Sequence, residues 1–183
     1  NRGAKQDAKI VSIDDNEPVR FDSHSLRLDY DFTGDIKLTD GACIGYRDAT
    51  KAVEGNPTGI GMWVYAPEGT PNLWLRVYLK DAKGSVVPLD FNEQSDIENG
   101  KMGGIDWTGW KYVEASLEGK QGPFTLFPGQ TVRAMYVPGK EMGYYTRGET
   151  KADGSYDMVK VPQSQRKGSI YIDNLQFVYG ANK

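Results

Sequence analysis

An alternation of apolar and polar residues, interrupted by short turn sequences, is the feature that most constrains the fold of this chain. Residues 73–80 (LWLRVYLK) place leucine or valine at every second position, and residues 25–32 (SLRLDYDF) repeat that arrangement. A period of two is typical of a β-strand that buries one face. The 4 Trp, 11 Tyr and 6 Phe residues favour strands further. The pattern therefore predicts an all-β fold.

Turn sequences such as PEGTP at 67–71 and DAKG at 81–84 divide the chain into short segments. We expect strands at residues 25–32, 42–46, 59–66, 73–80, 86–91, 110–117, 131–137 and 169–179. Many short strands at this spacing predict two antiparallel sheets in a jelly-roll β-sandwich. The shared phase of their alternation predicts a core of Leu28, Met62, Val64, Leu75, Val77, Leu79, Val113, Ala115, Ile172 and Phe177.

The chain shows no internal repeat and no linker, so we expect one domain over residues 1–183. Residues 138–167 depart from the strand pattern and are expected to form a long loop insertion. Loops of this length are usually either functional or disordered. Two interpretations stay open: a surface insertion, or a loop beside a binding face to which Tyr144 and Tyr145 contribute.

Charge and residue usage exclude several functions. The 22 Lys and Arg residues nearly balance 25 Asp and Glu residues, which argues against a nucleic-acid partner. No apolar run is long enough for membrane insertion. Cys43 is the single cysteine and His24 the single histidine, which excludes a zinc site built from several such ligands. Glycoside hydrolysis needs two facing carboxylates, and nothing selects Asp29 and Asp31 over other pairs. We expect no catalytic activity and no catalytic cofactor.

Aromatic residues on one strand face suggest sugar binding instead. Trp74, Arg76 and Tyr78 share a face of the expected strand at 73–80, and Trp63 and Tyr65 lie on a candidate neighbouring strand. Aromatic rings match the C–H face of a sugar, and arginine matches its hydroxyl groups. The alternative is that these rings belong to the core, above all Trp63.

Two further tryptophans lie close together in IDWTGW at 105–110. Trp110 opens a strand and is expected in the core. Trp107 lies in the preceding loop, where a core role and a binding role are both open.

Asp173 interrupts the last strand with a polar side chain. Calcium prefers six to eight oxygen ligands, and Asp14, Asp15 and Glu17 are candidate co-ligands for one structural ion. The equal alternative is that Asp173 accepts backbone N–H groups at a β-bulge.

GSIYIDNL at 168–175, followed by Phe177, is similar to the closing strand of carbohydrate-binding modules with a galactose-binding-like jelly roll. Three further segments stand in the expected order: VRFDSHSLRL at 19–28, GIGMWVY at 59–65 and WKYVE at 110–114. The chain resembles more closely still the accessory domain found beside bacterial phosphodiester glycosidase domains. That likeness lies in LDYDF at 28–32, WLR at 74–76 and residues 105–114.

The resemblance implies a non-catalytic module of a secreted or cell-surface bacterial protein that acts on polysaccharide. Its partners would be a poly- or oligosaccharide and the other domains of a larger parent chain. In such modules a calcium ion often ties the closing-strand aspartate, here Asp173, to the N-terminal loops. Two alternatives stay open: a spacer domain associated with the cell wall, and a small jelly-roll hydrolase or lyase.

Overall fold

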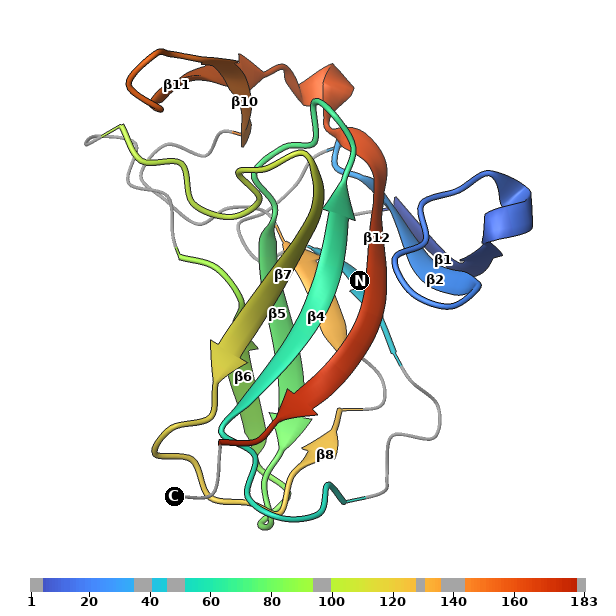
Figure 1. Cartoon of the computed structure of the whole chain (residues 1–183), viewed down its shortest axis with the longest axis vertical. Helices are drawn as coiled ribbons and strands as arrows, with labels where there is room; N and C mark the ends of the chain where they lie inside the picture. The colour runs from blue at the N-terminus through green and yellow to red at the C-terminus, as the bar shows by residue number, and fades with distance from the viewer. Residues whose placement is uncertain are drawn as a thin grey trace.

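Two antiparallel β-sheets packed face to face form the body of the protein (Figure 1). The computed structural model describes residues 5–34, 41–45, 52–93, 100–127, 131–135 and 144–180. In spatial order, sheet A contains β1 (Lys5–Ser12), β2 (His24–Asp31), β12 (Lys167–Val178), β4 (Gly59–Ala66) and β7 (Gly109–Ser116). Sheet B contains β3 (Gly41–Ile44), β9 (Val132–Met135), β5 (Trp74–Lys80) and β6 (Val86–Asp90), and β8 (Thr125–Leu126) also pairs with β5. The all-β sandwich is confirmed, and its jelly-roll character stays a prediction.

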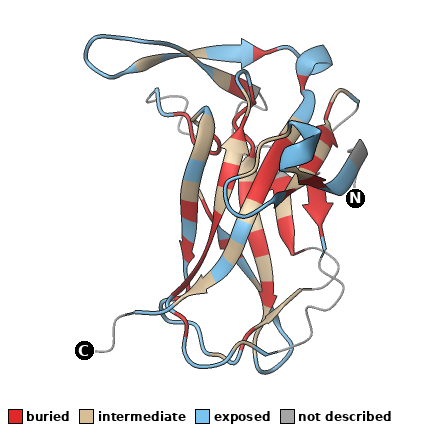
Figure 2. Cartoon of the chain, turned by 45° about the vertical axis from the view of Figure 1, so that its right-hand side comes forward, coloured by how far each residue is buried: buried red, intermediate tan, exposed pale blue. Residues whose placement is uncertain are grey.

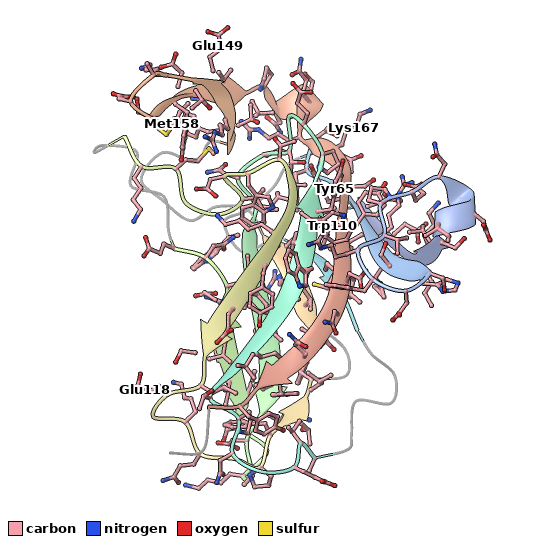
Figure 3. All side chains as sticks on the ribbon, in the orientation of Figure 1. Tyr65, Trp110, Glu118, Glu149, Met158 and Lys167 are labelled. Atoms are coloured by element: carbon pink, nitrogen blue, oxygen red, sulfur yellow. The ribbon has the colours of Figure 1, made fainter. Side chains whose placement is uncertain are left out.

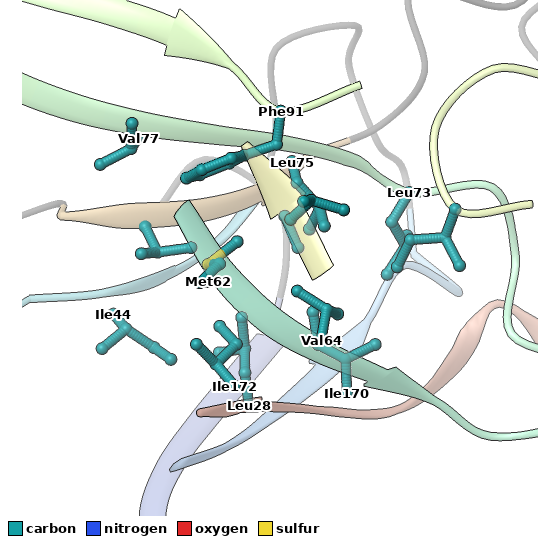
Figure 4. Packing of buried hydrophobic residues seen from close by; sticks show 14 of the residues in the cluster. Leu28, Ile44, Met62, Val64, Leu73, Leu75, Val77, Phe91, Ile170 and Ile172 are labelled. Carbon is teal, nitrogen blue, oxygen red and sulfur yellow. The ribbon is translucent and has the colours of Figure 1, made fainter. Parts of the chain in front are cut away.

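The core lies between the two sheets and contains the residues that the alternation predicts. Met62 and Val64 of β4 and Leu75 and Val77 of β5 are fully buried in one layer of packed side chains (Figure 4). Phe177 differs slightly, because it is partly buried and packs against this cluster. Along the strands, buried residues alternate with more exposed ones (Figure 2). Burial of each large apolar side chain contributes about 1.5–3 kcal/mol to folding.

The first strand has no equivalent in the sequence prediction. β1 pairs along its whole length with β2, yet Ile10 is 71% exposed and Val11 is buried. An edge strand that buries so little carries only a weak alternation of apolar residues. Pairing with β2 stabilises it through backbone hydrogen bonds, which leave no pattern in the sequence.

The expectation of a loop over residues 138–167 is wrong for its described part. β10 (Tyr144–Thr150) and β11 (Tyr156–Val161) form a two-stranded hairpin beyond one end of the sandwich (Figure 1). The short 3₁₀ helix η2 (Gln163–Gln165) then leads into β12. Residues 138–143 lie outside the described residues.

The hairpin turn repeats the chemistry of the turn between β5 and β6. In the β5–β6 turn, the Asp81 N–H donates to the Ser85 carbonyl and the Gly84 N–H donates to the Asp81 carbonyl. In the β10–β11 turn, the Lys151 N–H donates to the Ser155 carbonyl and the Gly154 N–H donates to the Lys151 carbonyl. Both glycines have a positive φ, which side chains disfavour. The sequence ADGS at 152–155 was therefore a hairpin signal that the polar flanking residues concealed.

The hairpin is attached to the sandwich through paired hydrogen bonds. The Asn72 N–H donates to the Tyr145 carbonyl at 2.8 Å, and the Tyr145 N–H donates to Asn72 Oδ1 at 2.9 Å. The side chain of Val161 joins the main core. Among the described residues, no helix is long and apolar enough to cross a membrane.

Candidate functional site

The two predicted halves of the sugar site lie on different sheets. β4, with Trp63 and Tyr65, belongs to sheet A, whereas β5, with Trp74 and Arg76, belongs to sheet B. Each strand turns its aromatic residues away from the shared core, so the two sets lie on opposite outer faces of the sandwich. The expectation that these strands are neighbours is wrong. A sequence shows which residues share a strand face, but it does not show which strands pair.

On the outer face of sheet B, the predicted ligand-binding groups contact other protein groups. Arg76 forms a forked ion pair with Asp90, through Nε to Oδ1 at 2.6 Å and a terminal nitrogen to Oδ2 at 3.0 Å. The Asp90 hydrogen bonds raise the pKa of Arg76. The guanidinium also lies 4.8 Å from the centre of the Trp74 ring, and Trp74 Nε1 donates to the Asn92 carbonyl at 3.1 Å. The Arg76 guanidinium, which the sequence predicts to bind sugar, is therefore already paired with Asp90.

Tyr78 continues the same face and also has protein neighbours. Its hydroxyl accepts a long hydrogen bond, 3.4 Å, from Arg133, and its ring lies 6.5 Å from the Phe127 ring. The Tyr78 side chain therefore also contacts protein groups on the outer face of sheet B.

The outer face of sheet A carries a row of aromatic residues from three adjacent strands. Tyr171 of β12 is opposite Tyr65 of β4, which is opposite Trp110 of β7. The Tyr65 ring lies 5.4 Å from Trp110 and 5.9 Å from Tyr171, each edge to face. Tyr65 and Trp110 are labelled in Figure 3. The expectation of a core position for Trp110 is wrong, because its side chain points outward and is half-buried. The missed signal was the alternation of Trp110, Tyr112 and Glu114 along β7.

Trp63 lies in the next row, enclosed by neighbours. The Arg20 guanidinium lies 4.4 Å from the centre of its ring, and the rings of Phe21 and Tyr112 lie 5.8 Å and 5.7 Å away. Such contacts hold the indole in place. They also cover part of the ring face on which a sugar could stack. Trp63 therefore supports the face, whereas Tyr65 and Trp110 are better placed to receive a ligand.

Two glycines let side chains of β7 lie across β4. A Cβ atom at Gly61 would lie 2.1 Å from the Tyr112 hydroxyl oxygen, and one at Gly59 would lie 2.8 Å from the Glu114 carboxylate. The Tyr112 hydroxyl in turn donates to Glu114 at 3.1 Å. The absence of side chains at these two positions of β4 thus creates a polar patch beside the aromatic row.

The indole N–H groups distinguish the four tryptophans. Trp74 and Trp107 donate theirs to backbone carbonyls, of Asn92 at 3.1 Å and of Val64 at 3.2 Å. Within the described part of the chain, the N–H groups of Trp63 and Trp110 have no acceptor and are not buried. Both unpaired donors are on sheet A, where a bound hydroxyl group can accept from them.

The remaining predicted aromatic residues have separate positions. Trp107 is partly buried against the core, and the Lys111 ammonium lies 4.7 Å from the centre of its ring. Tyr145 is 8% exposed and anchors the hairpin, so its side chain offers little surface to a ligand. The side chain of Tyr144 lies outside the described residues.

A charged network fixes the N-terminal loop over the edge of the aromatic row. Arg27 bonds to Glu17 at 2.6 Å and to Asp29 at 2.7 Å, Tyr171 donates to Glu17, and Ser169 donates to Asp29. The Tyr171 hydrogen bond lowers the pKa of Glu17 despite burial. Burial and the nearby Glu17 carboxylate raise the pKa of Tyr171 to about 12. These carboxylates therefore orient neighbouring groups.

Asp173 adopts the second of its two predicted roles. Its Oδ2 accepts the backbone N–H groups of Arg20 at 2.9 Å and Phe21 at 3.0 Å, and a β-bulge follows at Asn174, which has a φ of 50°. Two backbone N–H groups directed at this oxygen explain the position of the carboxylate at the bulge.

The predicted calcium ligands near the N-terminus make contacts within their own segment. Asp15 accepts the Ser12 N–H at 2.8 Å, which lowers its pKa, and Asp14 lies beside it in the 3₁₀ helix η1 (Ile13–Asp15). Nowhere among the described residues do three Asp, Glu, His or Cys side chains lie close enough to hold a metal ion. No contact of Asp173, Asp14 or Asp15 supports the predicted site.

Comparisons of the chain with protein-family models, with curated proteins and with solved structures return no match.

Proposed function

We propose that this protein is a non-catalytic carbohydrate-binding domain whose binding surface is the outer face of sheet A. The observation that carries the proposal is the contrast in indole N–H groups: Trp63 and Trp110 have unused donors there, beside the half-exposed ring of Tyr65. A sugar ring presents C–H groups to an aromatic face and hydroxyl groups to its edge. The Tyr65–Trp110 pair supplies both kinds of contact.

Polar groups beside the aromatic row complete the proposed surface. Tyr112 and Glu114 lie over the glycines of β4, and Gln176 is opposite Gly61 on the other side. These side chains can donate to and accept from sugar hydroxyl groups. Because three paired strands hold them, little conformational entropy remains to be lost on binding. A secreted or cell-surface location, as part of a larger parent chain that acts on polysaccharide, belongs to the same proposal.

A glycan array followed by titration calorimetry tests the proposal. We expect Trp110→Ala to lower the affinity for the best glycan by about thirtyfold, since a central aromatic anchor typically contributes about 2 kcal/mol. Trp110→Phe keeps a ring but removes the indole donor and should lower affinity less. The matched control Trp74→Phe removes the donor on sheet B and should leave affinity unchanged.

The opposite outcome is equally informative. If Trp74→Phe lowers the affinity and both Trp110 variants bind normally, the sugar site lies on sheet B. Failure to bind any glycan would support a spacer domain, and release of product from a polysaccharide by the isolated chain would support a hydrolase or lyase.

A further inference from the structure

A cleft of about 320 Å³ lies at the β7 edge of sheet A, lined by residues 91–93, 101–104, 106–107 and 111–114. Its wall includes Tyr112 and Glu114, which also belong to the outer face of sheet A. The cleft is therefore continuous with the proposed sugar-binding surface. Ligand pockets for small molecules usually begin at about 300 Å³, so this one suits one or two sugar rings rather than a longer stretch.

The backbone of the loop segments that line the cleft is held in place. The Gly104 N–H donates to the Glu93 carbonyl at 3.0 Å, and the Ile105 N–H donates to the Leu73 carbonyl at 3.0 Å. Gly104 has a φ of 69°, and a Cβ atom there would lie 2.4 Å from the Asn72 carbonyl oxygen. A glycine is thus needed for this wall to pack against the start of β5.

One lining side chain has unused hydrogen-bonding capacity. Asn92 Oδ1 accepts the Leu75 N–H at 3.1 Å, which fixes the amide. Its Nδ2 is buried and has no acceptor among the described residues. Buried polar groups normally have partners, so a ligand oxygen that reaches Asn92 from the cleft would supply the missing acceptor.

The other lining groups favour a neutral ligand with hydroxyl groups. Glu93 pairs with Lys101, and Asp106 pairs with Lys111 at 3.2 Å, so their charges offset each other. Glu114 adds a further carboxylate, and the lining thus holds three carboxylates against two ammonium groups. An anionic ligand would meet a slight excess of negative charge, whereas hydroxyl groups can donate to the carboxylates.

Apolar side chains complete the cleft. Phe91, Met102 and Val113 are buried in its wall, and Trp107 is partly buried beside them. Sugars combine hydroxyl groups with apolar C–H surface, which matches this mixture.

We propose that the cleft is a second subsite that binds the neutral terminal sugar of a glycan whose next units lie on the Tyr65–Trp110 row. This inference rests on the proposed function. It adds that the protein recognises chain ends, because the cleft is too small for a longer stretch.

The experiment uses ¹⁵N-labelled protein and neutral monosaccharides: glucose, galactose, mannose, xylose and rhamnose, with glucuronic acid as the anionic comparison. At least one neutral sugar should shift the Asn92 side-chain amide signals and the Trp107 indole signal in a saturable way. The Trp110 indole signal should not move with monosaccharides and should move with oligosaccharides. Glucuronic acid should bind more weakly than the neutral sugar of the same ring.

Two variants test the assignment. Asn92→Asp keeps an oxygen for the Leu75 N–H but removes the donor, and should weaken monosaccharide binding at least tenfold. If that variant does not fold, Glu93→Gln removes a carboxylate acceptor from the cleft without touching Asn92, and should also weaken binding.

The outcomes separate this inference from the proposed function. If oligosaccharides shift the Trp110 signal while no sugar shifts the Asn92 amide, the cleft assignment is overturned and the sheet A site stands. If monosaccharides shift the Asn92 amide while oligosaccharides leave Trp110 unmoved, the cleft binds sugar and the sheet A site is overturned. If neither signal responds to any sugar, both are overturned.

Discussion

Both outer faces of the sandwich carry tryptophan and tyrosine at alternate positions, yet the contacts of these residues differ. On sheet B, Arg76 is paired with Asp90 and covers Trp74, whose N–H is bonded to Asn92. On sheet A, Tyr65 and Trp110 meet edge to face, and the Trp110 N–H has no acceptor among the described residues. Similar alternation thus produced one face whose tryptophan N–H is bonded to the protein and one face whose tryptophan N–H groups can bond to a ligand.

The largest expected effect is on the stability of sheet B. Trp74→Ala removes a half-buried ring, its hydrogen bond to Asn92 and its contact with Arg76, and should lower the free energy of unfolding by about 2 kcal/mol. Glycan affinity should not change. Urea unfolding with calorimetry on the same samples measures both. A stable variant with weakened glycan binding would reverse the roles of the two faces.

A smaller effect is expected from a methyl group on sheet A. Gly61→Ala places a Cβ atom where the Tyr112 hydroxyl now lies, so Tyr112 must move away from the patch. Glycan affinity should fall by about tenfold, which corresponds to about 1.4 kcal/mol. The matched control is Gly34→Ala, where a Cβ atom meets nothing within 4 Å. Equal affinity of the two variants would remove Tyr112 from the proposed surface.

Acid should destabilise sheet A through the Glu17 network. The pKa of Glu17 is lowered in the folded protein, chiefly by the Tyr171 hydrogen bond, relative to about 4.3 in the unfolded chain. This carboxylate therefore contributes stability above the unfolded pKa, and the contribution is lost as pH falls through the folded pKa. Melting temperatures between neutral pH and about pH 3 should fall less steeply for Glu17→Gln than for the parent. Identical slopes would show that Glu17 has the same pKa in both states.

A still smaller change is expected for Arg76→Lys on sheet B. Lysine keeps the charge but loses the fork that binds both oxygens of Asp90. Because this pair is partly exposed, the loss of stability should stay below about 1 kcal/mol, with no change in glycan affinity. A double-mutant cycle with Asp90→Asn measures the coupling. A loss of affinity without a loss of stability would return Arg76 to the binding site.

No effect is expected from removal of calcium. The Asp173 oxygen that accepts two backbone N–H groups explains this residue without an ion. Melting temperatures with calcium and with excess chelator should therefore agree. A higher melting temperature with calcium, absent in Asp173→Asn, would establish the calcium site that the sequence suggests.

Much of the fold follows from local pattern. The alternation at residues 59–66 predicts β4 with its bounds, and the alternation at residues 73–80 predicts β5 to within one residue. Residues 144–161 were misread because Tyr156–Val161 has few buried positions, and its hairpin is marked mainly by the turn. The weakly buried β1 was missed for a similar reason.

The candidate site was only partly predictable. The sequence indicates that aromatic residues of β4 and β5 face away from the core, and the structure agrees. It does not indicate that Trp110 joins Tyr65, because that contact depends on the pairing of β4 with β7. Nor does it indicate that Asp90 engages Arg76, which depends on the register of β5 with β6.

The sequence by itself determined which side chains point inward and which point outward, because the two-residue period of a strand is a local property of the backbone. The tertiary structure alone decided which outward side chains meet, through strand order, register and the two glycines of β4. Those contacts join residues far apart in the chain, such as Arg20 with Trp63 and Tyr171 with Glu17. Whether an aromatic residue is satisfied or available to a ligand therefore depends on neighbours that local pattern does not specify.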